Sequence, residues 1–242
     1  MRKSPLWALI LLCATATAAA PAAASTFTIA PIRAELGAAH HSAALTLINV
    51  EDQPVVVEVR AVTWSQIDGE EHLEDTHDLL VSPAVLQIPA NGSQIVRVAL
   101  RNAANEDHEI TYRVVFDEIP QAAPAGFNGL RVALRLSVPV FVAPAHCRPI
   151  PNVTWDLHHL EDGSFEVAAF NQGTAHLLVT DFDVEAGMAT PLHAKTSKYL
   201  LAGSRMTWQL KSDDVQAWQG PILVHGHSDQ GEFTAPISSH GL

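Results

Sequence analysis

The chain of 242 residues is short of cysteine and of basic side chains. Cys13 and Cys147 are its two cysteines. Cys13 lies in the segment that is interpreted below as a cleaved secretory signal, so only Cys147 would remain after export. This excludes an intramolecular disulfide, so the stability of the folded chain has to come from hydrophobic cores. Lys and Arg number 14 against 26 Asp and Glu, which gives a formal net charge of −12. The acidic excess makes nucleic acid and anionic membranes poor candidate partners, and we expect neither.

Long hydrophobic runs are also lacking, apart from a short one near the N-terminus. Residues 1–24 carry two basic side chains near their start, an apolar run over residues 6–12, and then Ala22 and Ala24 in A-x-A spacing. This order is typical of a secretory signal, and we expect cleavage near Ala24. A membrane anchor would need about twenty apolar residues, so stable membrane insertion is not expected. Cleavage removes two basic residues and no acid, which changes the net charge from −12 to −14.

Enzyme signatures are absent: the sequence has no G-x-S-x-G, no H-E-x-x-H and no glycine-rich phosphate loop after a strand. We therefore expect a non-enzymatic protein without a cofactor. The 13 histidines suggest a metal site, but neighbours such as 40–41 and 158–159 would point to opposite faces of a strand. His225 and His227 share a face without an identifiable third ligand, so we expect no metal. The acidic run 68–78 lacks the order of a calcium loop and is expected to be a solvated hairpin loop between strands.

Alternation of apolar and polar residues with a period of two dominates the rest of the sequence, without a convincing helical period. Gly, Pro, Asn and Asp separate the alternating segments, which predicts short antiparallel strands. Seven such strands in succession indicate a β-sandwich of the immunoglobulin type. Their ranges are 25–36, 43–50, 54–64, 79–88, 93–100, 109–119 and 130–142.

A proline-rich segment at 143–152 interrupts this pattern, and the alternation resumes beyond it. Prolines stiffen linkers, and a change of composition of this kind is typical of a domain boundary. We therefore expect an all-β chain of two immunoglobulin-like β-sandwich domains. The first would span residues 25–143 and the second, smaller one residues 148–242.

The strand predicted at 130–142 is unusually long. Its apolar side carries Leu130, Val132, Leu134, Leu136, Val138, Val140 and Val142. Thirteen residues would extend over about 43 Å, whereas a strand usually has about 5–6 residues. An uncovered apolar edge promotes aggregation, and natural proteins normally shorten or charge such an edge. Its retention here suggests that another chain adds a strand to it.

Two neighbouring segments resemble a known family at this point. The run "YRVVFDEIP" (112–120), a loop, and "GLRVALRLSVPVFVAP" (129–144) are similar to the F1 strand, loop and G1 strand of PapD-like periplasmic chaperones, which assemble pili by the chaperone–usher route. Further segments match the family in the same order, so that the resemblance covers essentially the whole mature chain. They are 27–36, 50–64, 79–100 and 165–184.

The resemblance implies a fold, a location and a mechanism. The family has two immunoglobulin-like domains in a boomerang arrangement and works in the periplasm without nucleotide. It implies that the protein completes pilin subunits by donor-strand complementation and delivers them to an outer-membrane usher. The residues lent to the subunit would be Leu130, Val132, Leu134, Leu136 and Val138.

The resemblance also implies a carboxylate anchor. The family holds the terminal carboxylate of its subunit with an Arg on the first strand and a Lys late in G1. Arg33 matches the Arg, whereas Pro139 stands at the position of the Lys. Arg135 and Arg97 are the other basic candidates for the anchor. A charge-assisted bond of this kind would fix the register of strand pairing.

Two departures from the family carry information. With Pro139 in place of the Lys, the predicted G1 strand resembles that of the archaic branch of the family, whose subunits are spore-coat-U-like pilins. Ala143 stands where the family usually has an Arg of an interdomain salt bridge. Glu118 and Asp229 are candidate members of such a network, and their partner is not identifiable from the sequence.

Two other classes of protein stay open. An exported immunoglobulin-like structural or adhesive protein would be expected to lack a strand of its own or to carry an N-terminal donor extension. An exported metal-binding protein would need histidines that converge on one ion.

Overall fold

The computed structural model describes residues 27–102, 107–120, 132–187, 190–211 and 220–240. Within these ranges every regular element is a strand, and no helix is long and apolar enough to span a membrane. The predicted signal at 1–24 and the donor candidate Leu130 lie outside the described residues.

The N-terminal half forms two sheets that pack face to face. The first has the order β1 (Phe27–Ala30), β3 (Ser42–Asn49), β8 (Ser93–Leu100) and β6 (Leu79–Ser82). The second has the order β2 (Ala34–Leu36), β10 (Arg135–Val142), β9 (Ile110–Ile119), β4 (Val55–Ile67) and β5 (Glu70–Asp75), with β7 (Val85–Ile88) also paired to β4. Alternate side chains of both sheets fill one core, for example Leu47 and Val96 from the first and Val59 and Phe116 from the second. Each such buried side chain contributes about 1.5–3 kcal/mol before the entropy of ordering it is subtracted.

Prolines divide two of the predicted strands. The range 25–36 is split at Pro31 into β1 and β2, and the range 79–88 is split at Pro83 into β6 and β7. Proline has no N–H for a sheet ladder, which makes it a natural end point for a strand. β1 pairs with β3 and β2 pairs with β10, so the first predicted strand passes from one sheet to the other.

The acidic run 68–78 contains the expected solvated hairpin turn, followed by a strand, β5, that was not expected. β5 pairs with β4 through a tight turn at Asp68 and Gly69, whose φ angles are 52° and 82°. Two positive φ values are typical of the two-residue hairpin turn that Asp-Gly favours. All six side chains of β5 are exposed. The strand itself was missed because a strand without a buried side lacks the alternation on which the prediction depended.

The C-terminal half is a single seven-stranded sheet that folds back on itself around its own core. Its order is β14 (Leu192–Leu200), β13 (Leu177–Ala186), β16 (Ile222–Ser228), β17 (Gly231–His240), β11 (Val153–His159), β12 (Ser164–Asn171) and β15 (Arg205–Lys211). β17 joins the two faces, because it pairs with β16 up to Pro236 and with β11 from Ile237 onward. Large side chains from both faces, such as Trp155, Phe165 and Phe182, fill the space between them.

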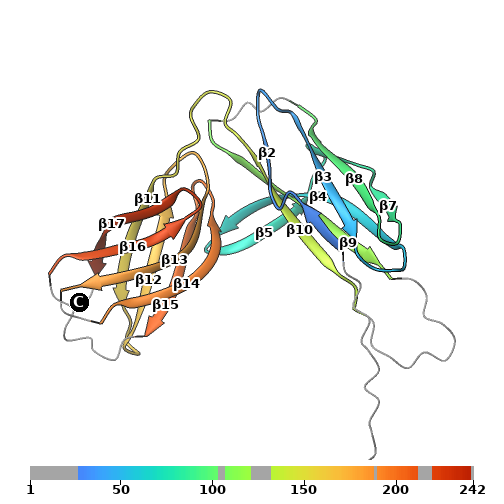
Figure 1. Cartoon of the computed structure of the whole chain (residues 1–242). Coiled ribbons are helices and arrows are strands. Elements are labelled where there is room, and N and C mark those ends of the chain that lie inside the picture. The colour runs from blue at the N-terminus through green and yellow to red at the C-terminus, as the bar shows by residue number, and fades with distance from the viewer. Residues whose placement is uncertain (1–26, 103–106, 121–131, 188–189, 212–219, 241–242) are drawn as a thin grey trace, which may run out of the picture.

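The two halves are arranged as the arms of an open V (Figure 1). β4 has thirteen residues, and its C-terminal end reaches the second arm. There Trp64 packs with Phe141 and Leu201 in a small buried cluster. The side-chain amide of Gln66 donates to the carbonyl of Tyr199 at 2.7 Å and accepts from the N–H of Leu201 at 3.0 Å. These contacts position the two arms relative to each other.

Candidate functional site

β10 is shorter than the thirteen-residue strand predicted for this segment. Its regular pairing covers the eight residues Arg135–Val142. Its ladder with β9 begins at Arg135, which pairs with Asp117, and β9 ends two residues beyond that partner, at Ile119. Just before the strand, both backbone groups of Leu134 still bind Glu118. The carbonyl accepts from the Glu118 N–H at 2.9 Å, and the N–H donates to the Glu118 carboxylate at 3.0 Å.

The first half of β10 has an open edge among the residues that the structure describes. β9 pairs with the whole strand, whereas β2 on the other side pairs only with Val140–Val142. Because the backbone of Leu134 faces β9, antiparallel geometry directs the N–H and C=O groups of Arg135 and Ser137 toward the open side. Pro139 has the same orientation but no N–H to offer. This half of the strand therefore presents backbone groups that an added strand can pair with.

The predicted donor side chains change from exposed to buried along the segment. Val132 is 54% exposed, while Leu134 and Leu136 are half-buried and pack against the rim of the N-terminal core. Val138 is 4% exposed and belongs to that core. The structure therefore leaves Leu134, Leu136 and Val132 accessible to a partner, whereas Val138 has no free surface.

Arg33 lies beside the end of this open edge. It directly precedes β2, whose first residue Ala34 pairs with Val140 of β10. Its guanidinium donates to the Asp229 carboxylate at 2.8 Å and lies 3.2 Å from Glu35. The hydrogen bond to Asp229 raises the pKa of Arg33 above its ordinary value. Arg33 is therefore a cation already paired with an acid of the other arm.

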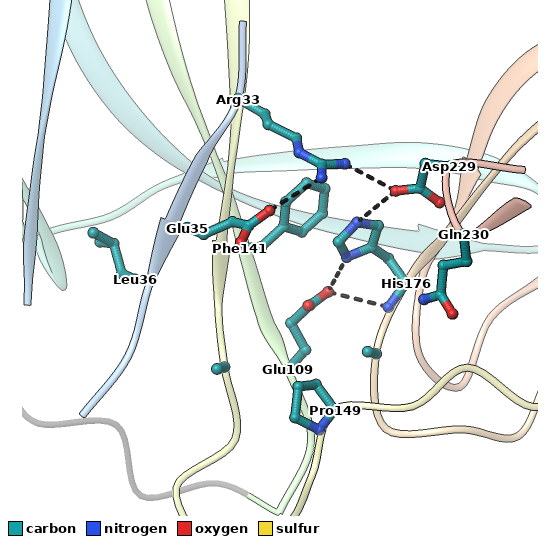
Figure 2. A pocket seen from close by; sticks show the side chains of 11 residues that line it. Arg33, Glu35, Leu36, Glu109, Phe141, Pro149, His176, Asp229 and Gln230 are labelled. Atoms are coloured by element: carbon teal, nitrogen blue, oxygen red, sulfur yellow. Dashed lines mark hydrogen bonds and ion pairs between the residues drawn. The ribbon is translucent and has the colours of Figure 1, made fainter. Parts of the chain in front are cut away.

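Asp229 belongs to a chain of ionisable side chains between the arms (Figure 2). His176 Nε2 lies 3.8 Å from the Asp229 carboxylate, and His176 Nδ1 lies 2.7 Å from Glu109. The His176 ring stacks on Phe141 with 3.5 Å between the ring centroids. These groups and Arg33 line a cavity of about 220 Å³ between the two halves of the chain.

The interdomain network differs from the candidates that the sequence offered. Asp229 belongs to it and takes Arg33 as its partner across the arms. Glu118 does not, because its carboxylate binds the backbone of Leu134 at the start of β10. Sequence reasoning missed His176 and Glu109, since a single histidine and a single glutamate without a motif give no signal.

The three candidate anchor arginines do not lie together. Arg135 is at the opposite end of the open edge from Arg33 and binds Asp117 on the neighbouring strand. Arg97 is on β8 in the other sheet, where its residue pairs with Ala44 and Ser82. Only Arg33 is next to the point where β2 closes the edge of β10.

The histidines of the C-terminal half form pairs with acids on an exposed face. His225 and His227 share a face of β16, as the alternation predicted. His227 Nδ1 lies 2.7 Å from Asp181, and His225 Nε2 lies 3.7 Å from Glu185. Among the residues that the structure describes, no group of three or more His, Cys, Asp or Glu side chains is arranged to hold a metal ion.

The Asp181–His227 pair makes stability depend on pH. Its hydrogen bond lowers the pKa of Asp181 below 3.8 and raises the pKa of His227 above 6.5. The Asp181 contribution is lost as the pH falls through its lowered pKa, and that of His227 is lost as the pH rises through its raised pKa. We expect His227→Gln to lower the melting temperature most between these two pKa values and not at pH 9. Thermal unfolding of both chains at pH 5 and 9 measures this, and an equal deficit at both would contradict it.

Residues 26–148 match the family described as pili and flagellar-assembly chaperone, PapD N-terminal domain. The match covers just over half of the chain and includes both sheets of the N-terminal half. The chain belongs to this chaperone family. It is a periplasmic, non-enzymatic chaperone that assists pilus assembly.

Solved chaperone structures share the fold of both arms. The archaic CsuC–CsuE chaperone–tip adhesion subunit complex from Acinetobacter baumannii gives a TM-score of 0.68 at 18% identity, covering 89% of this chain and 100% of that one. The YadV chaperone gives 0.62 at 19% identity, with 87% and 98% covered. The SafB chaperone in complex with SafA pilin from Salmonella enterica gives 0.58 at 16% identity, with 88% and 95% covered. A search of curated proteins found no significant match.

Proposed function

We propose that this chaperone captures pilus subunits by donor-strand complementation along the open edge of β10. The observation that carries the proposal is the combination of unpaired backbone groups on Arg135 and Ser137 with the accessible apolar side chains of Leu134 and Leu136. Backbone groups supply affinity to an added strand, and alternate side chains supply the fit. In the sequence, Leu130 and Val132 continue the same apolar alternation toward the N-terminus. Val138 is left out of this proposal because it fills the core of the chaperone.

The end of the open edge suggests how the register is fixed. β2 occupies the edge from Val140 onward, so a strand added alongside β10 has to stop before it. If the added strand runs in the same direction as β10, its C-terminus arrives beside Arg33. A guanidinium binds a carboxylate strongly and directionally. We therefore assign the subunit's terminal carboxylate to Arg33, and we assign no such role to Arg135 or Arg97, which lie elsewhere.

The partners follow from the same reasoning. Pro139 in place of a lysine and the similarity in fold to an archaic chaperone support spore-coat-U-like pilins as the subunits. Two of the similar structures contain a chaperone together with a tip adhesion subunit or a pilin. We propose that the subunit then passes to an outer-membrane usher, and that the chaperone reaches the periplasm through a signal cleaved near Ala24.

Co-expression tests the proposal. The chaperone is produced in a periplasm with each pilin-like protein encoded beside its gene, and the proteins that co-purify are identified by mass spectrometry. We expect a one-to-one complex with at least one subunit that is degraded when it is expressed alone. A chaperone that stabilises none of these subunits would overturn the proposed function.

A further inference from the structure

The proposed anchor Arg33 already pairs with two carboxylates in the free chaperone, that of the exposed Glu35 on its own arm and that of Asp229 on the other arm. Asp229 accepts its hydrogen bond at 2.8 Å, at the place assigned above to the subunit's terminus. Among the residues that line the cavity between the arms, Arg33 is the only Arg or Lys. A subunit carboxylate and the Asp229 carboxylate therefore need the same cation.

Asp229 is built to remain in place when Arg33 leaves. The backbone N–H of Leu178 donates to Asp229 Oδ1 at 3.1 Å, and the Asp229 N–H donates to the carbonyl of Leu178 at the same distance. His176 Nε2 lies 3.8 Å from the other carboxylate oxygen. His176 is itself held by Glu109 and by stacking on Phe141. Because these partners are independent of Arg33, the Asp229 carboxylate keeps a hydrogen-bond donor when the guanidinium moves away.

We infer that Asp229 is an internal competitor for the subunit's terminal carboxylate, so that loading a subunit exchanges one carboxylate for another on Arg33. This inference rests on the proposed anchor role of Arg33. Asp229 comes from the C-terminal arm and Arg33 from the N-terminal arm, so the exchange removes one contact between the arms each time a subunit is loaded. In the free chaperone the positive charge of Arg33 is thus neutralised by Asp229. A bound strand whose terminal carboxylate does not reach Arg33 would break this ion pair without forming a new one.

The expected effect of this competition on subunit capture follows from the solvent exposure of the Arg33 and Asp229 side chains. The Arg33 side chain is 38% exposed and that of Asp229 is 16% exposed. An ion pair of this kind, partly screened by water, corresponds to a change of about two- to fivefold in an equilibrium constant. Removing the competing charge is therefore expected to strengthen subunit capture by about this factor.

The experiment is a competition for the subunit that co-purifies with the wild-type chaperone. Asp229→Asn removes the charge and keeps the amide oxygen that Leu178 N–H needs. Differently tagged wild-type and variant chaperones are expressed together with a limiting amount of subunit, and mass spectrometry measures the captured ratio. We expect about two- to fivefold more subunit on Asp229→Asn. Asp183→Asn, a matched change on the exposed face of the same arm, is expected to capture as much as wild type.

Two further experiments distinguish competition for Arg33 from a merely structural role of Asp229. In an Arg33→Ala background, Asp229→Asn is expected to give no gain, because there is no cation left to release. The gain is also expected to disappear for a subunit with a C-terminal extension, which displaces its carboxylate from Arg33. Equal or weaker capture by Asp229→Asn, or a gain that persists without Arg33, would overturn the inference.

Different results would reject the proposed function itself. If Arg33→Ala captures as much subunit as wild type, the anchor assignment itself is wrong and the inference falls with it. If no subunit co-purifies with the wild-type chaperone, donor-strand capture is wrong as a whole. A loss of capture with Arg33→Ala, together with no gain from Asp229→Asn, keeps the proposed function and rejects only the competition.

Discussion

Replacing Leu134 by Glu is expected to abolish subunit capture while the chaperone stays folded. Leu134 is half-buried at the rim of the N-terminal core, so in the free protein a glutamate there can turn its carboxylate to water. In a complex the side chain would be enclosed by the subunit, where an unpaired charge costs several kcal/mol. Asp117, Glu118 and Glu58 line the same surface and would add like-charge repulsion. A loss of about 2–4 kcal/mol corresponds to roughly 30- to 1000-fold weaker binding.

Ala133→Glu is the matched control for this variant. Ala133 is exposed and, unlike Leu134, does not pack against the N-terminal core, so the same charge is added one residue away without replacing an apolar side chain of that rim. Co-expression pull-downs measure capture by the two variants, and thermal unfolding shows that both are folded. Full capture by Leu134→Glu would refute the donor role of this face. Loss of capture by both variants would point to the total charge of the edge and against a side-chain fit.

Much of the fold could be predicted from the sequence because most strands have one buried side. The buried positions of β3, of β8 and of the first seven residues of β4 follow the alternation that predicted these strands. β5 could not be found in this way, since neither of its sides is buried. Its signal was instead the Asp68–Gly69 pair, which is typical of a hairpin turn.

The length of β10 shows a second limit of the alternation. Alternation reports which side of a segment is apolar, but pairing also needs a neighbouring strand, and β9 ends at Ile119. The apolar pattern continues upstream of Arg135, where the described residues 132–134 lie outside the regular strand. This mismatch between pattern and strand length supports the proposal that another chain pairs with the segment.

The site could be predicted only where a residue belongs to a local pattern. Leu134, Leu136 and Arg33 were identified from their strand positions and from the family resemblance. The partner of Asp229 was not, because it lies 196 positions away in the sequence and on the other arm. His176 was missed for the same reason, since its partner Glu109 is 67 positions away. Contacts between arms depend on the angle of the V, which no local periodicity encodes.

Phe141→Ala is expected to give the largest change in the arrangement of the two arms. Phe141 lies on the side of β10 opposite Val140 and Val142, and it packs on Trp64, Tyr199 and His176 of the interdomain contact. Truncating a buried Phe to Ala costs about 3–5 kcal/mol. Because Val140 and Val142 keep the N-terminal core filled, most of this loss falls on the contact between the arms. We expect a lower melting temperature and a larger radius of gyration in small-angle X-ray scattering.

Phe182→Ala is the control, since Phe182 is equally large and fully buried but lies within the C-terminal core. It is expected to lower the melting temperature by a comparable amount and to leave the radius of gyration of the folded protein unchanged. An unchanged radius in Phe141→Ala would show that Gln66 and the charged groups hold the arms without the aromatic contact. If the radius does increase, Arg33 and Asp229 meet less often. Phe141→Ala should then reduce the advantage of Asp229→Asn in the competition, because the contact that this substitution removes is already partly broken.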